Sequence, residues 1–137
     1  MRMFQKILLA IIFGNLCFIS SNALSADWAL LVENRNAAVT ILYDSDSLAV
    51  SNNTVRVWLK WQYENHEFKD HENQLFELDC RESKFRVLEE ITYLKEGWSS
   101  EKDEKNDRIR KRTSASNWQF VEPDTVGMVM KKKFCQK

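Results

Sequence analysis

The two histidines of the chain stand close together in an acidic segment. His66 and His71 are separated by four residues. The acidic residues around them are Glu64, Glu67, Asp70 and Glu72. Imidazole and carboxylate groups are ligands that zinc accepts, but this spacing only permits convergence on a metal or a heme iron. His66 and His71 are therefore only candidates for binding a metal or heme. The alternative is that residues 64–73 form a solvated acidic loop. We expect no cofactor.

The densest group of cations lies in one short run. It consists of Arg108, Arg110, Lys111 and Arg112. Such a run is able to bind a sulfated glycan, lipid head groups or an acidic segment of a partner. The alternative interpretation is an edge strand that its charges keep soluble. These four residues are candidate partner-binding residues.

The sequence offers no catalytic constellation. With only three glycines, the chain has no Gly-rich phosphate-binding loop. Glu89 and Glu90 are adjacent in a run of strand character, so their side chains face opposite sides and cannot work as an acid–base pair. We therefore expect a protein that is not an enzyme.

Residues 1–26 have the pattern of a secretory signal peptide. Arg2 and Lys6 precede an apolar run over residues 7–19, and the small residues after it predict cleavage behind Ala23 or Ala26. An uncleaved anchor is the alternative, but the run is short for a span of ~20 residues. A lipid on Cys17 is a further alternative, although the preceding residues stand in the wrong order for a lipoprotein box. We expect one exported domain over residues 27–137, in the periplasm or on the outer cell surface.

The charge of the exported part disfavours nucleic acid as a partner. The whole chain has 20 basic and 20 acidic side chains. Cleavage removes Arg2 and Lys6 and no acid, which leaves a net charge near −2. A nucleic-acid surface attracts a cationic protein, so we expect no nucleic-acid partner. We also expect no stable membrane span, because cleavage removes the apolar run over residues 7–19.

Two cysteines remain once the signal peptide is removed. Cys80 and Cys135 form an even pair in a chain bound for an oxidising compartment, which predicts one disulfide between them. Two free thiols are the alternative.

The hydrophobic pattern indicates an antiparallel sheet. The clearest alternation covers residues 54–63, where Val55, Val57 and Leu59 share one face. Further runs of strand character cover residues 28–33, 37–43, 74–80, 84–94 and 107–113. In residues 84–94 neither alternate set is purely apolar, which predicts a bulge or a change of exposure.

The end of the chain predicts a short helix. Pro123 stops the preceding strand, and Asp124 or Thr125 can cap a helix. The apolar stripe of this helix consists of Val126, Val129, Met130 and Phe134. On an ideal helix Cys135 points away from that stripe, so the helix must end before it for the disulfide to form. The fold class is α+β, with an antiparallel sheet of about six strands and a C-terminal helix tied to one face by the disulfide.

The sheet is wider than this helix. A helix is ~10–12 Å wide with its side chains, whereas six strands span ~25 Å or more, so part of the sheet has no helical cover. Arg56, Trp58 and Lys60 lie on the wetter face of residues 54–63 and are candidate contact residues for a partner or a second copy. The alternative is that Trp58 stacks on a cross-strand neighbour.

An ordered set of positions resembles a known family. The set is Trp28, Tyr43-Asp44-x-x-Ser47, Asn53-x-Val55-x-Val57-Trp58-x-Lys60, Cys80, Arg86-Val-Leu88, Trp118-x-x-Val121-x-Pro123-x-Thr125 and Cys135. Over essentially all of the exported part, the chain resembles the surface-adhesin protein E family of Gram-negative bacteria. The resemblance implies a six-stranded antiparallel sheet with a C-terminal helix held to one face by a disulfide. It also implies an exported protein, because the members of this family are small exported proteins. The founding member is an adhesin that binds host extracellular-matrix and serum proteins, so the resemblance implies an adhesin role.

Three functional hypotheses follow. The first is an exported, non-enzymatic interaction protein that binds a host matrix protein or an envelope protein, or a second copy of itself, through its sheet. The alternative is a periplasmic envelope protein of structural or stress role without a host ligand. The third is a metal- or heme-binding protein that uses His66 and His71.

Overall fold

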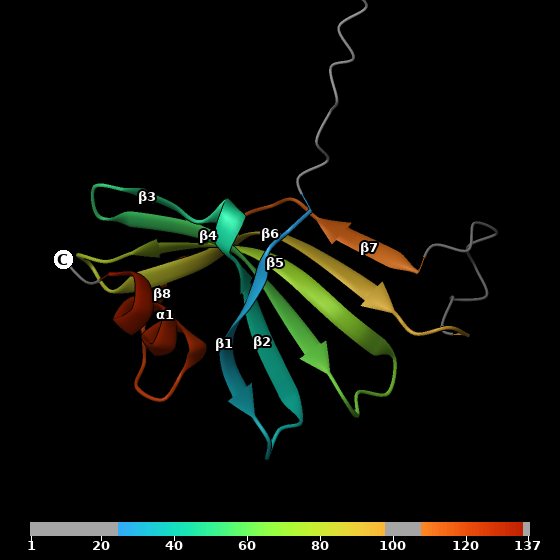
Figure 1. Cartoon of the computed structure of the whole chain (residues 1–137). Helices are drawn as coiled ribbons and strands as arrows, with labels where there is room; N and C mark the ends of the chain where they lie inside the picture. The colour runs from blue at the N-terminus through green and yellow to red at the C-terminus, as the bar shows by residue number, and fades with distance from the viewer. Residues whose placement is uncertain (1–24, 98–107, 136–137) are drawn as a thin grey trace, which may run out of the picture.

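The computed structural model describes residues 25–97 and 108–135 (Figure 1). The predicted cleavage site at Ala23 lies outside this part, as do the apolar run over residues 7–19 and Cys17. None of the helical segments in these two ranges has the length and hydropathy of a membrane span.

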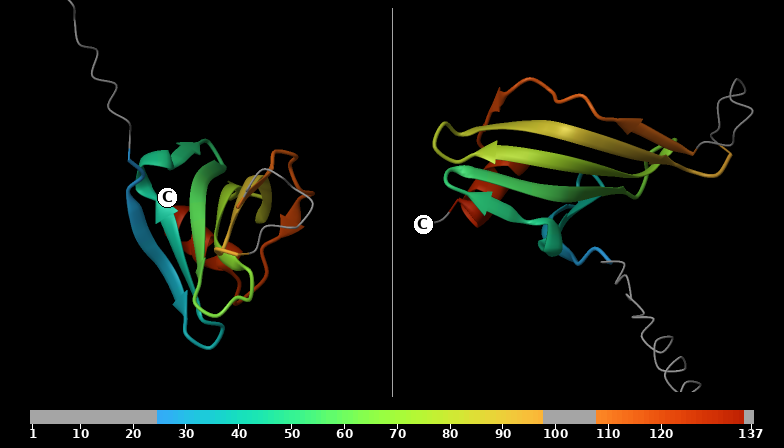
Figure 2. Two further views of the ribbon diagram at one scale, coloured as in Figure 1. Left: turned by 90° about the vertical axis from the view of Figure 1, so that its right-hand side faces the viewer. Right: turned by 90° about the horizontal axis from the view of Figure 1, so that it is seen from above.

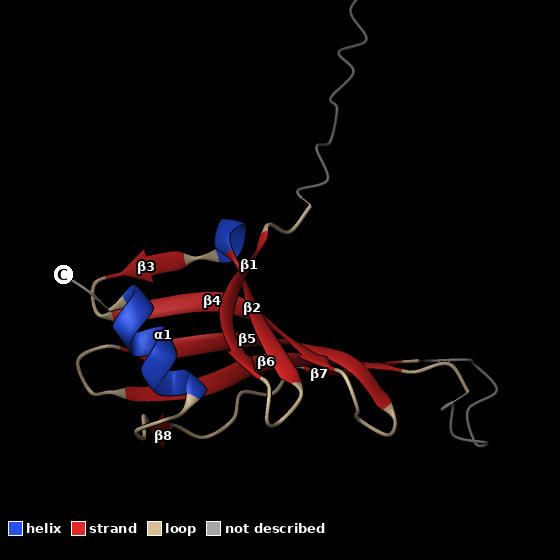
Figure 3. Ribbon diagram, turned by 60° about the horizontal axis from the view of Figure 1, so that its bottom comes forward, coloured by secondary structure: helices blue, strands red, loops and turns tan. Residues whose placement is uncertain are grey.

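An antiparallel sheet forms most of the domain. The strands of its main path follow the order β1-β2-β4-β5-β6-β7, which confirms the predicted sheet of about six strands (Figures 1 and 3). Two short strands extend this sheet, since β3 pairs with β4 and β8 pairs with β6. The strands are β1 Trp28–Asn34, β2 Val39–Asp44, β3 Ala49–Ser51, β4 Thr54–Tyr63, β5 Lys69–Asp79, β6 Lys84–Leu94, β7 Ile109–Arg112 and β8 Gln119–Phe120. A 3-10 turn, η1, covers Ser45–Ser47, and the single α-helix of the described part, α1, covers Val126–Phe134.

The predicted loop over residues 64–73 is wrong in its second half. β5 begins at Lys69, and His71, Glu72 and Asn73 pair in register with both β4 and β6. A strand with neighbours on both sides satisfies its backbone groups, so polar side chains there are compatible with a sheet. Only residues 64–68 remain outside the strands.

The predicted bulge is present in β6. Phe76 of β5 is opposite Val87, whereas Leu75 is opposite Glu89, so Leu88 has no cross-strand partner of its own. The extra residue reverses the alternation of β6. Val87 therefore shares a face with Phe76, whereas Glu89 lies on the other face with Leu75.

One face of the sheet carries the core, and α1 packs against it at the end where β3 and β8 lie (Figures 2 and 3). We call this the helix face and the opposite side the far face. The buried apolar cluster consists of Ile41, Val55, Val57, Leu59, Phe76, Leu78 and Met130. Met130 of α1 is 0% exposed, so the helix completes the core of the sheet.

The ends of α1 follow the prediction. The Oγ1 atom of Thr125 accepts a hydrogen bond from the backbone N–H of Met128 at 3.4 Å, as an N-cap side chain does. Gly127 lets the helix approach the sheet, because a Cβ atom there would lie 3.3 Å from the ring of Phe85. The helix ends at Phe134, and Cys135 forms the predicted disulfide with Cys80 at a Cα–Cα distance of 5.6 Å.

Candidate functional site

Three charged residues form a row across the far face. Arg56 on β4 lies opposite Glu77 on β5, and Glu77 lies opposite Arg86 on β6. Residues in register share a face of the sheet, so the three side chains meet. Glu77 accepts hydrogen bonds from Arg56 Nε at 2.5 Å and from Arg86 Nε at 2.8 Å. The central carboxylate thus holds two guanidinium groups in place.

The carboxylate of Glu77 is buried but stays ionised. Its side chain is 4% exposed, whereas those of Arg56 and Arg86 are 57% and 30% exposed. Burial alone would raise the pKa of Glu77. The hydrogen bonds from Arg86 and Arg56, together with their positive charges, lower it by a larger amount, so the pKa lies below the ordinary value. The row therefore presents the positive charges of Arg56 and Arg86 at the surface, and the negative charge of Glu77 lies buried between them.

Two exposed aromatic residues continue this row. Lys84 lies opposite Phe120 in register, which places both on the far face. The guanidinium carbon of Arg86 lies 4.4 Å from the ring centroid of Trp118, and Lys84 Nζ lies 5.0 Å from that of Phe120. Trp118 is 42% exposed and Phe120 70% exposed. We call Arg56, Lys84, Arg86, Trp118 and Phe120 the aromatic–cation surface.

Further exposed apolar side chains lie on the same face. Leu30 is opposite Leu42, which in turn is opposite Lys60, and Ile109 is opposite Tyr93. Leu30 and Ile109 are 57% and 54% exposed. They belong to β1 and β7, the two ends of the main strand path, so the far face carries apolar groups at both of its margins.

The three candidates on β4 lie on the far face as expected. Arg56 is part of the aromatic–cation surface. Trp58 is partly buried and lies in register opposite Leu75. Lys60 Nζ lies 4.4 Å from the ring centroid of Trp28.

The sequence interpretation missed Trp118 and Phe120 as contact residues. Their alternate spacing before Pro123 was the only signal in the sequence. The pairing of Phe120 with Lys84 and the contact of Trp118 with Arg86 bring both rings to the far face.

The side chains of the basic run are divided between the two faces of β7. β7 alternates, so Arg112 lies on the helix face opposite Glu90, whereas Lys111 lies on the far face opposite Ile91. Three of the four cations are paired with carboxylates. These pairs are Arg108 with Glu96 at 3.3 Å, Lys111 with Glu89 at 2.7 Å and Arg112 with Glu90 at 3.6 Å. Arg110 lies opposite Thr92 on the helix face.

The two histidines belong to different local structures. His66 lies between β4 and β5, where its Nδ1 atom accepts from the backbone N–H of Lys69 at 3.1 Å. His71 lies on β5, stacks on Tyr93 at a ring-centroid distance of 4.1 Å, and contacts Asp70. Across residues 25–97 and 108–135, no group of three or more His, Cys, Asp or Glu residues is arranged to hold a metal.

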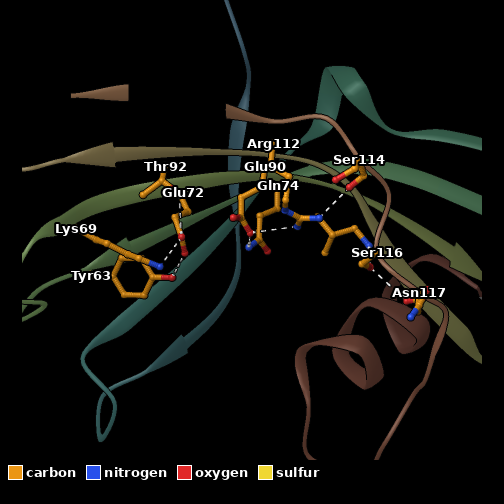
Figure 4. Close-up of polar contacts among 11 residues, drawn as sticks. Tyr63, Lys69, Glu72, Gln74, Glu90, Thr92, Arg112, Ser114, Ser116 and Asn117 are labelled. Carbon is orange, nitrogen blue, oxygen red and sulfur yellow. Dashed lines mark hydrogen bonds and ion pairs between the residues drawn. The ribbon is translucent and has the colours of Figure 1, made fainter. Parts of the chain in front are cut away.

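A polar cluster occupies the part of the helix face away from α1 (Figure 4). Glu72, whose side chain is 5% exposed, accepts from Lys69 Nζ at 2.6 Å, from Thr92 Oγ1 at 3.1 Å and from the Tyr63 hydroxyl. Burial alone would raise the pKa of Glu72, but the hydrogen bonds from Lys69 and Tyr63 lower it by a larger amount, so the pKa of Glu72 lies below the ordinary value. Burial and then Glu72 raise the pKa of Tyr63. The hydrogen bonds of Glu72 thus join β4, β5 and β6 in this part of the sheet.

Comparison with known proteins agrees with this arrangement. The family model described as Surface-adhesin protein E matches residues 28–136, which is most of the chain and all of the sheet and helix described above. No curated protein and no solved structure matches significantly. The family implies an exported protein. With its sheet, its C-terminal helix and its disulfide, the chain belongs to the surface-adhesin protein E family.

Proposed function

We propose that this protein is an exported, non-enzymatic adhesin that binds a protein partner, from the host matrix or from the bacterial envelope, through the far face of its sheet. Family membership supports an adhesin role. The observation that carries the proposal is the aromatic–cation surface, where Trp118 and Phe120 are 42% and 70% exposed beside ordered cations.

The residue types at this surface are those that dominate protein–protein interfaces. Tryptophan and arginine are the most enriched residues among binding hot spots. A partner that binds flexible side chains must offset the entropy of ordering them. Here Glu77 already fixes Arg56 and Arg86, and Arg86 lies over Trp118, so less entropy is lost on binding.

The buried carboxylates support a role other than catalysis. Both oxygens of Glu77 accept from arginines, and both oxygens of Glu72 accept from Lys69, Thr92 or Tyr63. A general base needs a free lone pair directed at substrate and a pKa near the working pH. The two glutamates have lowered pKa values and occupied oxygens.

The test compares two exposed apolar sites on opposite faces. Trp118→Ala combined with Phe120→Ala removes the aromatic pair, and Val50→Ala is the matched control, because Val50 is 61% exposed but lies opposite the buried Val55 on the helix face. Binding to immobilised extracellular-matrix proteins and to an immobilised bacterial envelope extract is measured by interferometry. We expect the double variant to lose about thirtyfold or more in affinity, ~2 kcal/mol, and the control to bind as wild type. Equal binding by all three proteins refutes the far-face interface.

Location is tested separately on intact cells. A surface adhesin is digested by protease added outside the cells, whereas a periplasmic protein is protected until the outer membrane is opened. Digestion on intact cells supports binding to a host protein. Protection contradicts it and favours an envelope partner.

A further inference from the structure

The last turn of α1 carries consecutive cations that the far face does not use. They are Lys131, Lys132 and Lys133. The disulfide and a hydrogen bond of 2.6 Å from Lys131 Nζ to Ser83 Oγ bring this end of the helix to the turn between β5 and β6 (Figure 1). That turn carries Arg81, which is exposed. We call Arg81, Lys131, Lys132 and Lys133 the basic end.

The basic end differs in charge from the rest of the domain. Counted with Glu82 of the same turn, its four cations leave a net charge of +3. The remaining charges beside it, Asp79 and Lys84, lie opposite each other in register and offset one another. The exported part as a whole has a net charge near −2. Positive charge is therefore concentrated at one end of a chain that is otherwise acidic, which attracts an anionic partner to that end.

Neutral groups hold these cations in place. Lys131 donates to the hydroxyl of Ser83, and Lys133 Nζ lies 5.0 Å from the ring centroid of Tyr43. Among the residues that the structure describes, no carboxylate forms an ion pair with Arg81, Lys131 or Lys133. The two arginines of the far-face row, in contrast, share a buried carboxylate. The charge of the basic end thus remains available to an anion from outside.

A hollow of about 640 Å³ lies beside these cations. Arg81 lines it together with Asn53 of the β3–β4 turn and the two cysteines of the disulfide. A guanidinium group donates paired hydrogen bonds to an oxyanion, and the amide of Asn53 can both donate to and accept from a hydroxyl. A flat bilayer surface does not follow a concave site, whereas a chain molecule can lie in it.

We propose that the basic end binds a sulfated polysaccharide, with sulfate groups on Arg81 and on the lysines of α1 and a sugar hydroxyl on Asn53. Sulfate esters stay ionised and recur along such a chain, so one chain meets several cations at once. The site goes beyond the proposed protein partner, because Arg81 belongs to a turn and the lysines to α1, whereas Trp118 lies beside the far-face residue Arg86.

The probe is a heparin-derived octasaccharide, titrated into the exported protein by calorimetry. The paired probes are the same oligosaccharide without its sulfate groups, and inorganic sulfate, which supplies the group without the chain. We expect saturable binding of the sulfated octasaccharide that weakens as salt is added, because the contacts are exposed and electrostatic. The desulfated chain and the free ion should show no saturable binding at the same concentrations.

Matched variants locate the site. Arg81→Gln and Lys133→Gln should each weaken binding of the octasaccharide about fivefold, the equivalent of roughly 1 kcal/mol. Arg35→Gln is the control, since it removes the same charge from the exposed turn between β1 and β2 and should bind as wild type. The Trp118→Ala/Phe120→Ala variant should also bind the octasaccharide as wild type, so a failure of the proposed adhesin surface and a failure of this site are seen separately.

The urea midpoint of each variant shows whether it is folded. The proposal is overturned by absence of saturable binding, by equal binding of the desulfated chain, or by equal losses in Arg81→Gln and Arg35→Gln, which would indicate an effect of net charge alone. Binding of the wild-type protein to phosphatidylglycerol vesicles without binding of the octasaccharide overturns it in favour of a membrane surface.

Discussion

Loss of the disulfide should destabilise the domain by about 4 kcal/mol. The perturbation is Cys80→Ser combined with Cys135→Ser in the exported protein. The bond joins residues 55 positions apart. In the chain-entropy model, closing a loop of that length in the unfolded chain contributes ~4 kcal/mol to the free energy of unfolding. That is a large share of the ~5–15 kcal/mol that typically stabilises a single domain.

The variant should nevertheless fold. Met130 is 0% exposed, and Val126 and Phe134 pack against the same core, so α1 has contacts with the sheet that do not involve sulfur. Thr125 still caps the helix. The expected product is a folded domain of lower stability, and not a sheet with a detached tail.

Urea unfolding followed by tryptophan fluorescence measures this. The wild-type protein is compared in oxidised form, after reduction, and as the double serine variant, and the last two should agree. The unfolding slope should rise on loss of the cross-link, because the unfolded chain then exposes more surface. A loss below ~1 kcal/mol would refute the loop-closure reasoning, and absence of a cooperative transition would refute the independent packing of α1.

Three further predictions concern single residues. Met130→Ala should cost ~2–5 kcal/mol in urea unfolding, because it empties a fully buried site, and the partly buried Met128→Ala should cost less; equal losses would contradict this packing. The pKa of Glu77 in the folded state lies below its ordinary value of 4.5, so its contribution to stability is present above pH 4.5 and is lost as the pH falls through the lowered pKa. The urea midpoint of the wild type should thus fall more steeply below pH 4.5 than that of Glu77→Gln, and parallel curves would count against the charged row. Thr125→Ala should lose ~1 kcal/mol of stability through the missing cap, whereas Thr125→Ser should lose little, and a similar loss in both would exclude the hydroxyl as its source.

Elements with a strong local pattern could be predicted from the sequence. The alternation around Val55, Val57 and Leu59 predicted β4 at its observed bounds. The mixed faces of residues 84–94 predicted a bulge or a change of exposure, and the register of β5 with β6 then showed a bulge at Leu88. The first half of β5 could not be predicted in this way. Its polar residue Glu72 is buried because Lys69, Tyr63 and Thr92 hold its charge, and two of those partners lie on other strands.

The candidate site was predictable only in part. Alternation places Arg56 on the wetter face, but its partner Glu77 is 21 residues away and the register of β5 brings the two together. Trp118 joins them through Arg86, which depends on the pairing of β8 with β6. The sequence also could not show which acids pair with the cations of residues 108–112, because Glu89, Glu90 and Glu96 lie far from them along the chain.

The position of α1 has a consequence for the order in which this domain matures. The helix follows every strand that it covers, so the strands are synthesised before the residue that fills the centre of the core, Met130. Until then the core cluster around Val55 and Val57 lacks Met130, and Cys80 has no partner for its disulfide. The core and the cross-link can therefore close only after the residues of α1 and Cys135 have been made.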